Sequence, residues 1–147
     1  MKILVTGAAG FIGSKLMGVL ASRGDEVVGI DSINNYYDVR LKYGRLSEMG
    51  VMLNDEFVWN QPIQSSRYET CRFIRMSIDD RHAMEELFER EHFEKVVNLA
   101  AQAGVRYSIT NPYAYLQSNL AGFLNVLECC RHYEVKHLVF ASSLSLI

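Results

Sequence analysis

Three glycines, Gly7, Gly10 and Gly13, lie between a short apolar run and a segment of helical periodicity. Their G-x-x-G-x-x-G spacing differs from the G-x-G-x-x-G of the common dinucleotide fingerprint, but its mechanics are similar. We expect Gly7 to turn the chain off a strand, Gly10 to let backbone N–H groups approach a diphosphate, and Gly13 to let a helix pack closely. The amino end of that helix, with its unpaired amides and partial positive charge, would complete an anion-binding site.

An acidic residue, Asp31, ends the next apolar run, 18 positions after Gly13. At the end of a second strand, a carboxylate can accept the protons of both ribose hydroxyls of a dinucleotide. The same charge would repel a 2′-phosphate, so the sequence favours NAD over NADP. From the pattern alone, two other interpretations stay open: a tight turn that binds no ligand, and an ordinary aspartate at a strand end.

Short apolar runs alternate with segments of helical periodicity along the chain, and these elements must position the glycines and Asp31. We predict strands over residues 2–6, 26–30, 71–76, 96–100 and 136–142, and helices over 11–23, 38–49, 80–91 and 112–132. The segment between 49 and 66 has no clear assignment. Strands that alternate with helices predict an α/β fold, a doubly wound parallel Rossmann sheet of about five strands with helices on both faces.

The apolar positions also predict which face of each helix packs inward. The predicted inward residues are Ile12, Leu16, Val19 and Leu20, then Val39, Leu41, Tyr43 and Leu46, then Ala83, Met84, Leu87 and Phe88. The last helix has a stripe formed by Tyr113, Leu116, Leu120, Leu124 and Leu127. This stripe either covers the sheet or forms an interaction surface, such as that of a homodimer through helix 112–132.

The composition is typical of a soluble globular protein with a single domain, with 147 residues, 49% hydrophobic and 22% charged. The net charge is −2 and the basic residues are scattered, which argues against nucleic acid or an anionic membrane as a partner. No apolar run approaches the roughly 18 residues that a transmembrane helix needs. Three cysteines and four histidines show no metal-ligand spacing, so we expect unpaired thiols, no metal site and a cytoplasmic location.

The sequence resembles the extended short-chain dehydrogenase/reductase family, and within it the UDP-glucuronate 4-epimerase-like branch. The resemblance covers nearly all 147 residues and is most specific over 34–43 (NNYYDVRLKY), 98–108 (NLAAQAGVRYS) and 119–128 (NLAGFLNVLE). It implies an NAD-dependent enzyme that oxidises and re-reduces the C4 position of a UDP-sugar through a 4-keto intermediate. Dehydration or decarboxylation of a nucleotide sugar, and a non-catalytic NAD-binding module, are the alternatives.

The resemblance also implies roles for individual residues. It places at the cofactor Gly7, Gly10, Phe11, Ile12, Gly13, Asp31, Asn34, Asn35, Ser77, Ile78, Leu99, Ala100, Ala101 and Gln102. Ser143 matches the catalytic serine or threonine that hydrogen-bonds the reacting sugar hydroxyl. For Arg106 two interpretations stay open: an exposed arginine in a loop, which the sequence favours, and a contact for an anionic substrate group. One departure is Ser77, which stands where the family usually has an acidic residue near the adenine. Binding of the base would therefore be weaker or use backbone groups.

The chemistry of the family also requires a tyrosine base and a lysine four residues later, whose charge lowers the tyrosine pKa. No Tyr-x-x-x-Lys occurs in the 147 residues, and in the family this pair lies beyond the position of Ile147. We therefore expect residues 1–147 to be one NAD-binding domain, truncated before the substrate-binding domain and inactive by itself.

Overall fold

The computed structural model describes residues 1–34, 38–52, 58–101 and 109–141. Six strands form one sheet in the order β3-β4-β2-β1-β5-β6. The strands are β1 (Lys2–Thr6), β2 (Glu26–Asp31), β3 (Pro62–Gln64), β4 (Cys71–Arg75), β5 (Lys95–Asn98) and β6 (His137–Phe140). All neighbouring pairs are parallel except β3 with β4. The predicted doubly wound α/β fold is confirmed.

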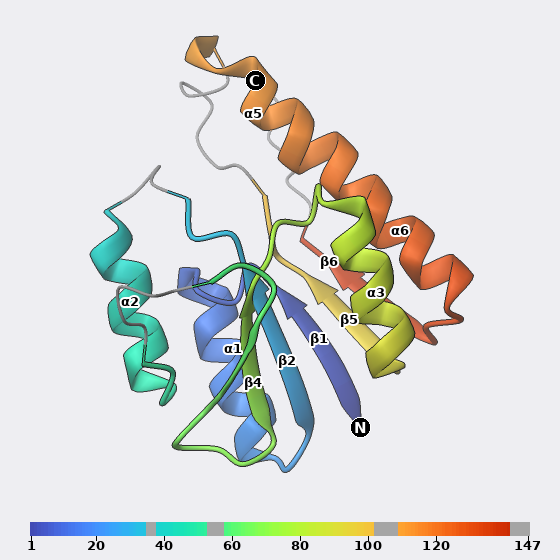
Figure 1. Ribbon diagram of the computed structural model, residues 1–147. Coiled ribbons are helices and arrows are strands. Elements are labelled where there is room, and N and C mark those ends of the chain that lie inside the picture. The colour runs from blue at the N-terminus through green and yellow to red at the C-terminus, as the bar shows by residue number, and fades with distance from the viewer. Residues whose placement is uncertain (35–37, 53–57, 102–108, 142–147) are drawn as a thin grey trace.

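Helices cover both faces of this sheet (Figure 1). They are α1 (Phe11–Ser22), α2 (Val39–Glu48), α3 (Arg81–Glu91), α5 (Pro112–Tyr115), the π-helical segment η1 (Leu116–Gly122) and α6 (Phe123–His132). Helices α1 and α2 lie on one face and α3 and α6 on the other. Because both faces are covered, successive strand residues such as Leu4 and Val5 are both fully buried.

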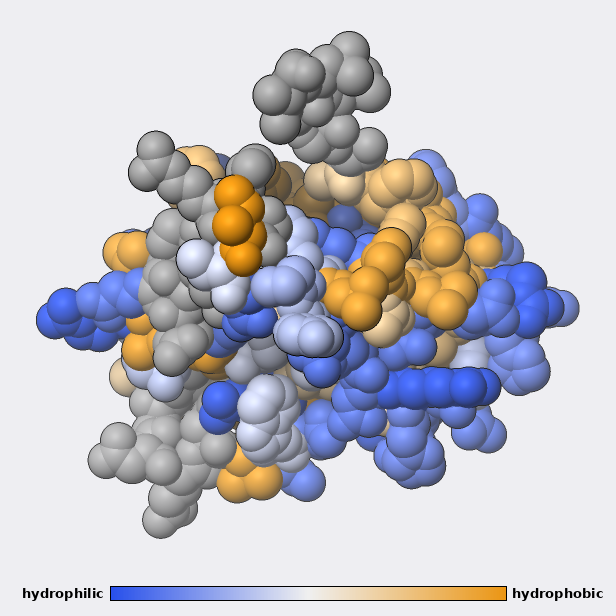
Figure 2. Space-filling view, turned by 90° about the horizontal axis from the view of Figure 1, so that it is seen from above, coloured by the Kyte–Doolittle hydropathy of each residue, from blue (hydrophilic) through white to orange (hydrophobic). Residues whose placement is uncertain are grey.

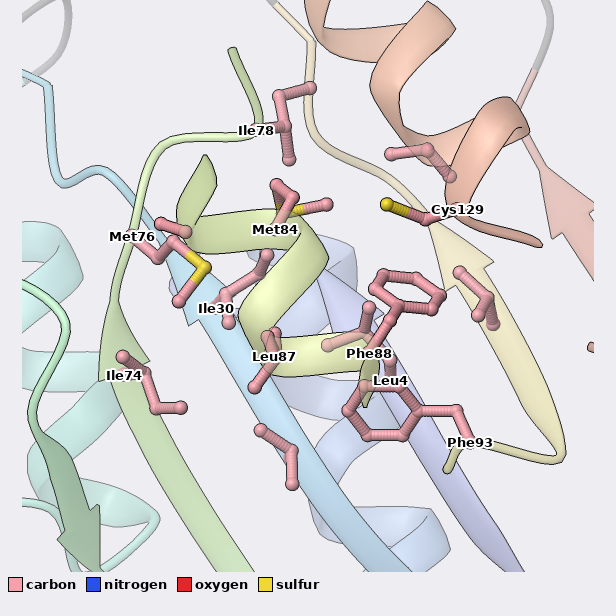
Figure 3. Close-up of a cluster of buried hydrophobic side chains, with 14 of the residues drawn as sticks. Leu4, Ile30, Ile74, Met76, Ile78, Met84, Leu87, Phe88, Phe93 and Cys129 are labelled. Carbon is pink, nitrogen blue, oxygen red and sulfur yellow. The ribbon is translucent and has the colours of Figure 1, made fainter. Parts of the chain in front are cut away.

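One of the two core clusters lies under α3 and is drawn in Figure 3. Phe88 of α3 packs edge-to-face on Phe93, with ring centroids 5.3 Å apart, above Leu4 of β1. All four residues predicted to point inward from this helix are buried, as the sequence indicated. This packing fixes α3 on the sheet and, with it, the turn that precedes the helix.

Three helices begin at a residue whose side chain caps the first turn. Asp38 accepts a hydrogen bond from Arg40 N, Asp80 from Ala83 N, and Asn111 from Ala114 N. Each side chain pairs one of the amides that a helix start leaves without a partner. The predicted helix starts are therefore confirmed to within a residue.

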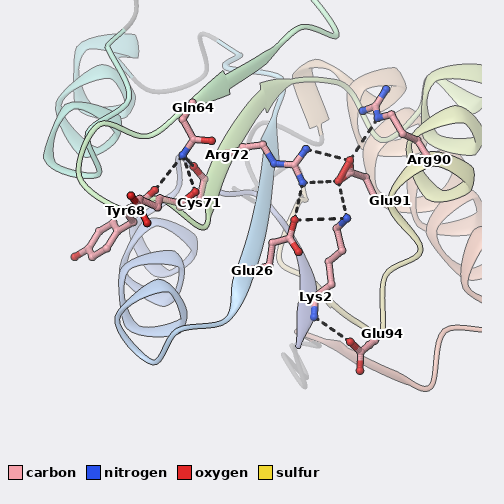
Figure 4. A network of polar contacts seen from close by, with 10 residues as sticks. Lys2, Glu26, Gln64, Tyr68, Cys71, Arg72, Arg90, Glu91 and Glu94 are labelled. Carbon is pink, nitrogen blue, oxygen red and sulfur yellow. Dashed lines mark hydrogen bonds and ion pairs between the residues drawn. The ribbon is translucent and has the colours of Figure 1, made fainter.

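Strand β3 was not predicted from the sequence. It is three residues long and lies antiparallel to β4 at the sheet edge, with Ile63 opposite Phe73. The side-chain amide of Gln64 donates to the Tyr68, Glu69 and Cys71 carbonyls and closes the connection to β4 (Figure 4). A strand of three residues is too short to show an alternation of apolar and polar residues, and its pairing depends on contacts with β4, which follows it in the chain.

The inward face of α1 differs from the prediction. Ile12 and Val19 are exposed, while Gly13, Met17, Leu20 and Ala21 are buried. The helix approaches the sheet so closely that glycine and alanine occupy part of the contact face. Because these small residues contribute little to a hydrophobicity pattern, the pattern did not identify this face. In α2 the prediction is also partly wrong, because Leu46 is buried but Leu41 and Tyr43 are exposed.

The stripe on the last helix faces solvent. Tyr113, Leu116, Leu120, Leu124 and Leu127 are all exposed, with Leu120 at 62%. The sheet is covered instead by Val126, Cys129 and Cys130 on the other side of α6. The alternative that the stripe covers the sheet is thus wrong. Across the part of the chain that the structure describes, helices long and apolar enough to traverse a bilayer are absent.

Candidate functional site

A pocket of about 440 Å³ lies at the carboxyl ends of the central strands. Its wall includes residues that follow β1, β2, β4 and β5, and one residue of η1, Ser118. Figure 2 looks down on this end of the molecule and shows hydrophobic patches among larger areas of hydrophilic side chains. Ligands of open parallel sheets bind at this edge, so the pocket is the candidate site.

The turn after β1 has the geometry expected of a diphosphate-binding loop. Gly7 adopts φ +71°, and a Cβ there would lie 2.8 Å from the Leu99 carbonyl carbon. A Cβ on Gly13 would lie only 2.0 Å from the Gly7 carbonyl oxygen. Both positions therefore require glycine, the first for its backbone conformation and its contact with residue 99, and the second because α1 sits directly on the loop.

The amino end of α1 lies at the pocket with its first amides unpaired. The Gly10 N–H donates to the Gly7 carbonyl oxygen at 3.0 Å, so it closes the loop. Within the described ranges, no side chain caps the helix, and no acidic residue occupies its first turn. The amides of Phe11 and Ile12, which have no acceptor among the described residues, are the donors left for an anion.

Asp31 is almost fully buried at the end of β2 and its carboxylate already has three donors. Oδ2 accepts from Ala9 N at 3.0 Å, and Oδ1 accepts from Ile33 N at 2.7 Å and Lys42 Nζ at 2.9 Å. Asp31 therefore joins the phosphate loop to β2 and α2. Little acceptor capacity is left for two ribose hydroxyls, so a diol would share the site with the Lys42 ammonium group rather than meet the carboxylate alone.

Lys42 and Arg45, one turn apart on α2, bring positive charge to the same side of the pocket. Arg45 Nη1 donates to the Ala9 carbonyl oxygen at 3.2 Å, and its guanidinium lies 5.9 Å from the centroid of the Phe11 ring. Ala9 and Asp31 are hydrogen-bonded to each other, and Lys42 binds Asp31 while Arg45 binds Ala9. Neither cation was predicted from the sequence, although their i, i+3 spacing on a helix was the available signal.

Thr6 holds the opposite wall of the pocket. Its hydroxyl donates to Asn98 Oδ1 at 2.5 Å and accepts from Leu99 N at 3.1 Å and Ala100 N at 3.0 Å. Both Thr6 and Asn98 are buried. This bond network joins the end of β1 to the end of β5 and fixes the segment 99–100 against Gly7.

The predicted cofactor residues are distributed as follows. Those in the pocket wall are Gly7, Gly10, Phe11, Asp31, Asn34, Ser77, Ile78, Leu99, Ala100 and Ala101. Ile12 and Gly13 belong to the first turn of α1 and are not among the wall residues. Asn35, Gln102, Arg106 and Ser143 fall outside the described residues. Wall residues that were not predicted from the sequence are Ile30, Ser32, Leu41, Lys42, Arg45, Met76 and Ser118.

The three thiols take no part in the site. Cys71, Cys129 and Cys130 are buried and unpaired, and burial raises their pKa values to about 11, 11 and 12. They are therefore protonated at neutral pH and poor nucleophiles. Among the described residues, no group of three histidine, cysteine, aspartate or glutamate side chains gathers into a metal site.

The parallel sheet, the glycine turn, the uncapped helix and the strand-end carboxylate together define a dinucleotide-binding domain of the Rossmann type. The chain belongs to the NAD dependent epimerase/dehydratase family, whose model matches residues 3–147. This is a family of NAD-dependent enzymes.

Two curated relatives match nearly the whole of this chain. Protein CapI of Staphylococcus aureus is 46% identical over 145 residues, which are 99% of this chain and 38% of that protein. UDP-glucuronate 4-epimerase 2 of Arabidopsis thaliana is 40% identical over 149 residues, or 99% of this chain and 30% of that protein.

Among solved structures, the UDP-glucose 4-epimerase of Thermus thermophilus in complex with NAD matches with a TM-score of 0.71 at 32% identity. The match covers 97% of this chain and 38% of that one. A UDP-glucose 4-epimerase from Thermotoga maritima, solved with UDP-glucose, has a TM-score of 0.73 at 32% identity, covering 97% and 38% of the two chains. The chain thus spans about two fifths or less of the length of these proteins.

Proposed function

We propose that residues 1–147 bind NAD in this pocket and form the cofactor-binding domain of a nucleotide-sugar 4-epimerase. The observation that carries the proposal is the close contact between the uncapped amino end of α1 and the turn after β1, which requires glycine at Gly7 in the turn and at Gly13 in the helix. Such a turn leaves room for a diphosphate close to backbone amides.

Each described group then has a role in binding the cofactor. The Phe11 and Ile12 amides would donate to the diphosphate, and the Asp31–Lys42 pair would bind the adenosine ribose. Residues 99–101, positioned by Thr6, would flank the nicotinamide half. When bound, NAD supplies the hydride acceptor for oxidation at the sugar C4 and the donor for its re-reduction.

UDP-glucuronate is the proposed substrate of the whole protein. Support comes from relatives named UDP-glucuronate 4-epimerase, which are 39–40% identical over nearly this whole chain. Ser143 is proposed to hydrogen-bond the reacting hydroxyl. The base and the substrate-binding domain are proposed to lie outside residues 1–147, so the chain alone should not epimerise UDP-glucuronate.

The exposed stripe on α5, η1 and α6 is the proposed homodimer surface. Five large side chains at helical spacing are exposed there, as they would be at an unpaired helix interface. The buried, protonated thiols suit a reducing compartment, and we propose the cytoplasm as the location.

Binding of NADH to the purified chain tests the first proposal. Trp59 is the one tryptophan of the chain, so quenching of its emission with energy transfer to the dihydronicotinamide would give a titration curve. In Gly13→Ala, a methyl group 2.0 Å from the Gly7 oxygen would displace the loop and lower the affinity at least about 100-fold, a loss of roughly 3 kcal/mol.

Gly44→Ala is the matched control, because its Cβ would meet nothing within 4 Å. It should bind NADH like the unchanged chain and stabilise α2 slightly. Equal affinity of all three chains, or no saturable binding by the unchanged chain, would refute the proposal.

A further inference from the structure

A second hollow adjoins the cofactor pocket and lies between α1, α2 and the loop that joins β3 to β4. Helices α1 and α2 are side by side on this face of the sheet (Figure 1). The hollow has a volume of about 700 Å³, and its wall is formed by Phe11 and by residues of the segments 14–23, 45–49 and 67–68. This α1–α2 groove shares Phe11 and Arg45 with the cofactor pocket, whereas its other wall residues line the groove only.

The α1 side of the groove has small side chains. Ser14, Gly18 and Ser22 line it at intervals of four residues, so they lie on one face of the helix. A Cβ on Gly18 would lie 3.5 Å from the Met49 sulfur, which is an ordinary contact distance. The small side chains leave room for a ligand, and the two serine hydroxyls can donate hydrogen bonds to it.

Positive charge dominates the groove. Its described wall carries four cationic side chains and a single carboxylate. Arg23 is paired with Asp25 at 3.4 Å. Among the residues that the structure describes, the other three cations have no carboxylate partner: Lys15, Arg45 and Arg67. The charge that the protein leaves uncompensated in this groove is therefore positive, although its net charge is −2.

Two of these cations are held in place without being neutralised. Arg45 Nη1 donates to the Ala9 carbonyl oxygen at 3.2 Å, and Arg67 Nη1 donates to the Glu48 carbonyl oxygen at 2.9 Å. The Arg67 guanidinium also lies 5.1 Å from the centroid of the Tyr68 ring. A carbonyl oxygen carries no net charge, and a guanidinium has five N–H donors, so each arginine keeps its charge and further donors for a ligand.

The loop that carries Arg67 is anchored to the end of α2. The hydroxyl of the buried Ser65 donates to the Met49 carbonyl oxygen at 2.6 Å and accepts from Arg67 N at 3.1 Å and Tyr68 N at 3.0 Å. A Cβ on Gly50 would lie 2.5 Å from Arg67 N, so the loop also packs directly on the residue that follows the helix end. The walls of the groove are therefore fixed relative to each other before a ligand binds.

We propose that the α1–α2 groove binds a small anion that carries more than one phosphate group. Lys15, Arg45 and Arg67 come from α1, from α2 and from the loop, so one ligand neutralises all three only if it is negative at several points. Phosphate oxygens accept the paired hydrogen bonds that a guanidinium donates. The volume of the groove is in the range of sites for small ligands. This site lies along the side of α1, and the proposal does not rest on NAD binding at the amino end of that helix.

Calorimetry with inorganic tripolyphosphate on the 147-residue chain tests the proposal. The titration is made with saturating NADH, so that the amino end of α1 is not available to the probe. The unchanged chain should bind tripolyphosphate at a single site. Arg67→Met should weaken this binding at least about tenfold, because charge-assisted hydrogen bonds are lost, and Lys15→Met should weaken it several-fold. Lys136→Met, at an exposed position beside the edge strand β6, removes the same charge outside the groove and is the matched control.

Glu48→Gln tests the sign of the electrostatic effect. Glu48 supplies the carboxylate of the groove wall, so its removal should strengthen tripolyphosphate binding several-fold, whereas a variant that only disturbed the fold would weaken it. Lys15, Glu48 and Arg67 are all exposed, so the three variants should fold, and circular dichroism would verify this.

The triphosphate nucleotide CTP distinguishes two sources of the same chemistry. A higher affinity for CTP than for tripolyphosphate would assign the groove to a nucleotide. Equal affinities would assign it to the phosphate chain itself.

The anion site and the cofactor site can fail separately. Absence of saturable tripolyphosphate binding would overturn the anion site. Binding that Gly13→Ala abolishes but that Lys15→Met and Arg67→Met leave unchanged would also overturn it, because the probe would then occupy the cofactor pocket. Failure of the unchanged chain to bind NADH, with tripolyphosphate binding still sensitive to Lys15→Met and Arg67→Met, would overturn the NAD site and leave the anion site standing.

Discussion

Replacing Glu91 with glutamine would remove the negative centre of a charge cluster at the amino edge of the sheet. Glu91, the last residue of α3, is 5% exposed. It accepts from Arg72 Nη2 at 2.5 Å and from Arg72 Nη1 at 3.1 Å, and Lys2 Nζ lies 3.1 Å away (Figure 4). These contacts join α3 to β1 and β4.

The size of the effect follows from the pKa of the Glu91 carboxyl. Burial alone would raise this pKa, but the hydrogen bonds and charges of Arg72 and Lys2 outweigh burial and lower it from 4.5 to about 2. A difference of that size corresponds to at most about 3 kcal/mol of folding free energy. Glutamine keeps the shape but leaves two cations without their central counter-charge, so we expect Glu91→Gln to cost about 2–3 kcal/mol at pH 7.

The contribution should also depend on pH in one direction. Since the folded pKa is depressed, the stabilisation is complete above the unfolded value of 4.5 and is lost as pH falls toward 2. The stability difference between the two chains should shrink by about 1 kcal/mol at pH 4 and about 2 kcal/mol at pH 3. Taking the difference between chains cancels the titration of other carboxyl groups.

Urea unfolding followed by far-ultraviolet circular dichroism at pH 7, 4 and 3 would measure these differences. Glu85→Gln, on the same helix, is the matched control, because the Glu85–Arg81 pair is exposed to solvent and should contribute little to stability. A stability difference for Glu91→Gln that stays constant from pH 7 to 3, or that equals the control, would refute the reasoning.

Three further predictions concern cofactor choice, association and thiol reactivity. Lys42→Met removes the cation bonded to Asp31, so the preference for NAD over NADP should rise at least several-fold in fluorescence titrations. Lys15→Met, outside the cofactor pocket, should leave this preference unchanged. An unaltered ratio of the NAD and NADP affinities in Lys42→Met would contradict the role of the cation. Leu120→Glu puts a charge in the middle of the exposed stripe and should convert a dimer to a monomer by light scattering; a chain that is monomeric before the change would contradict the dimer. Burial raises the pKa values of Cys129 and Cys130 to about 11 and 12, so the folded chain should react slowly with Ellman's reagent at pH 8 and quickly in urea. Rapid reaction of the folded chain would show that these thiols are not buried.

Local signals in the sequence determined much of the fold. Alternating apolar runs and helical segments predicted five parallel strands and their covering helices, and Asp38, Asp80 and Asn111 marked helix starts because a cap acts within one turn. The glycine spacing and Asp31 pointed to the edge of the sheet where the pocket lies, since strand ends in a parallel sheet share that edge.

Contacts between distant segments were decided only in the tertiary structure. Lys42 became part of the pocket because α2 folds back over β2. Thr6 supports the wall residues Leu99 and Ala100 because β1 pairs with β5, where Asn98 lies 92 positions away. The exposed side of α6 could not be distinguished from its buried side, because both are apolar and only the sheet beneath selects one. Hydrophobic periodicity reports that a face is apolar, but the identity of the group that covers it depends on packing between elements far apart in the chain.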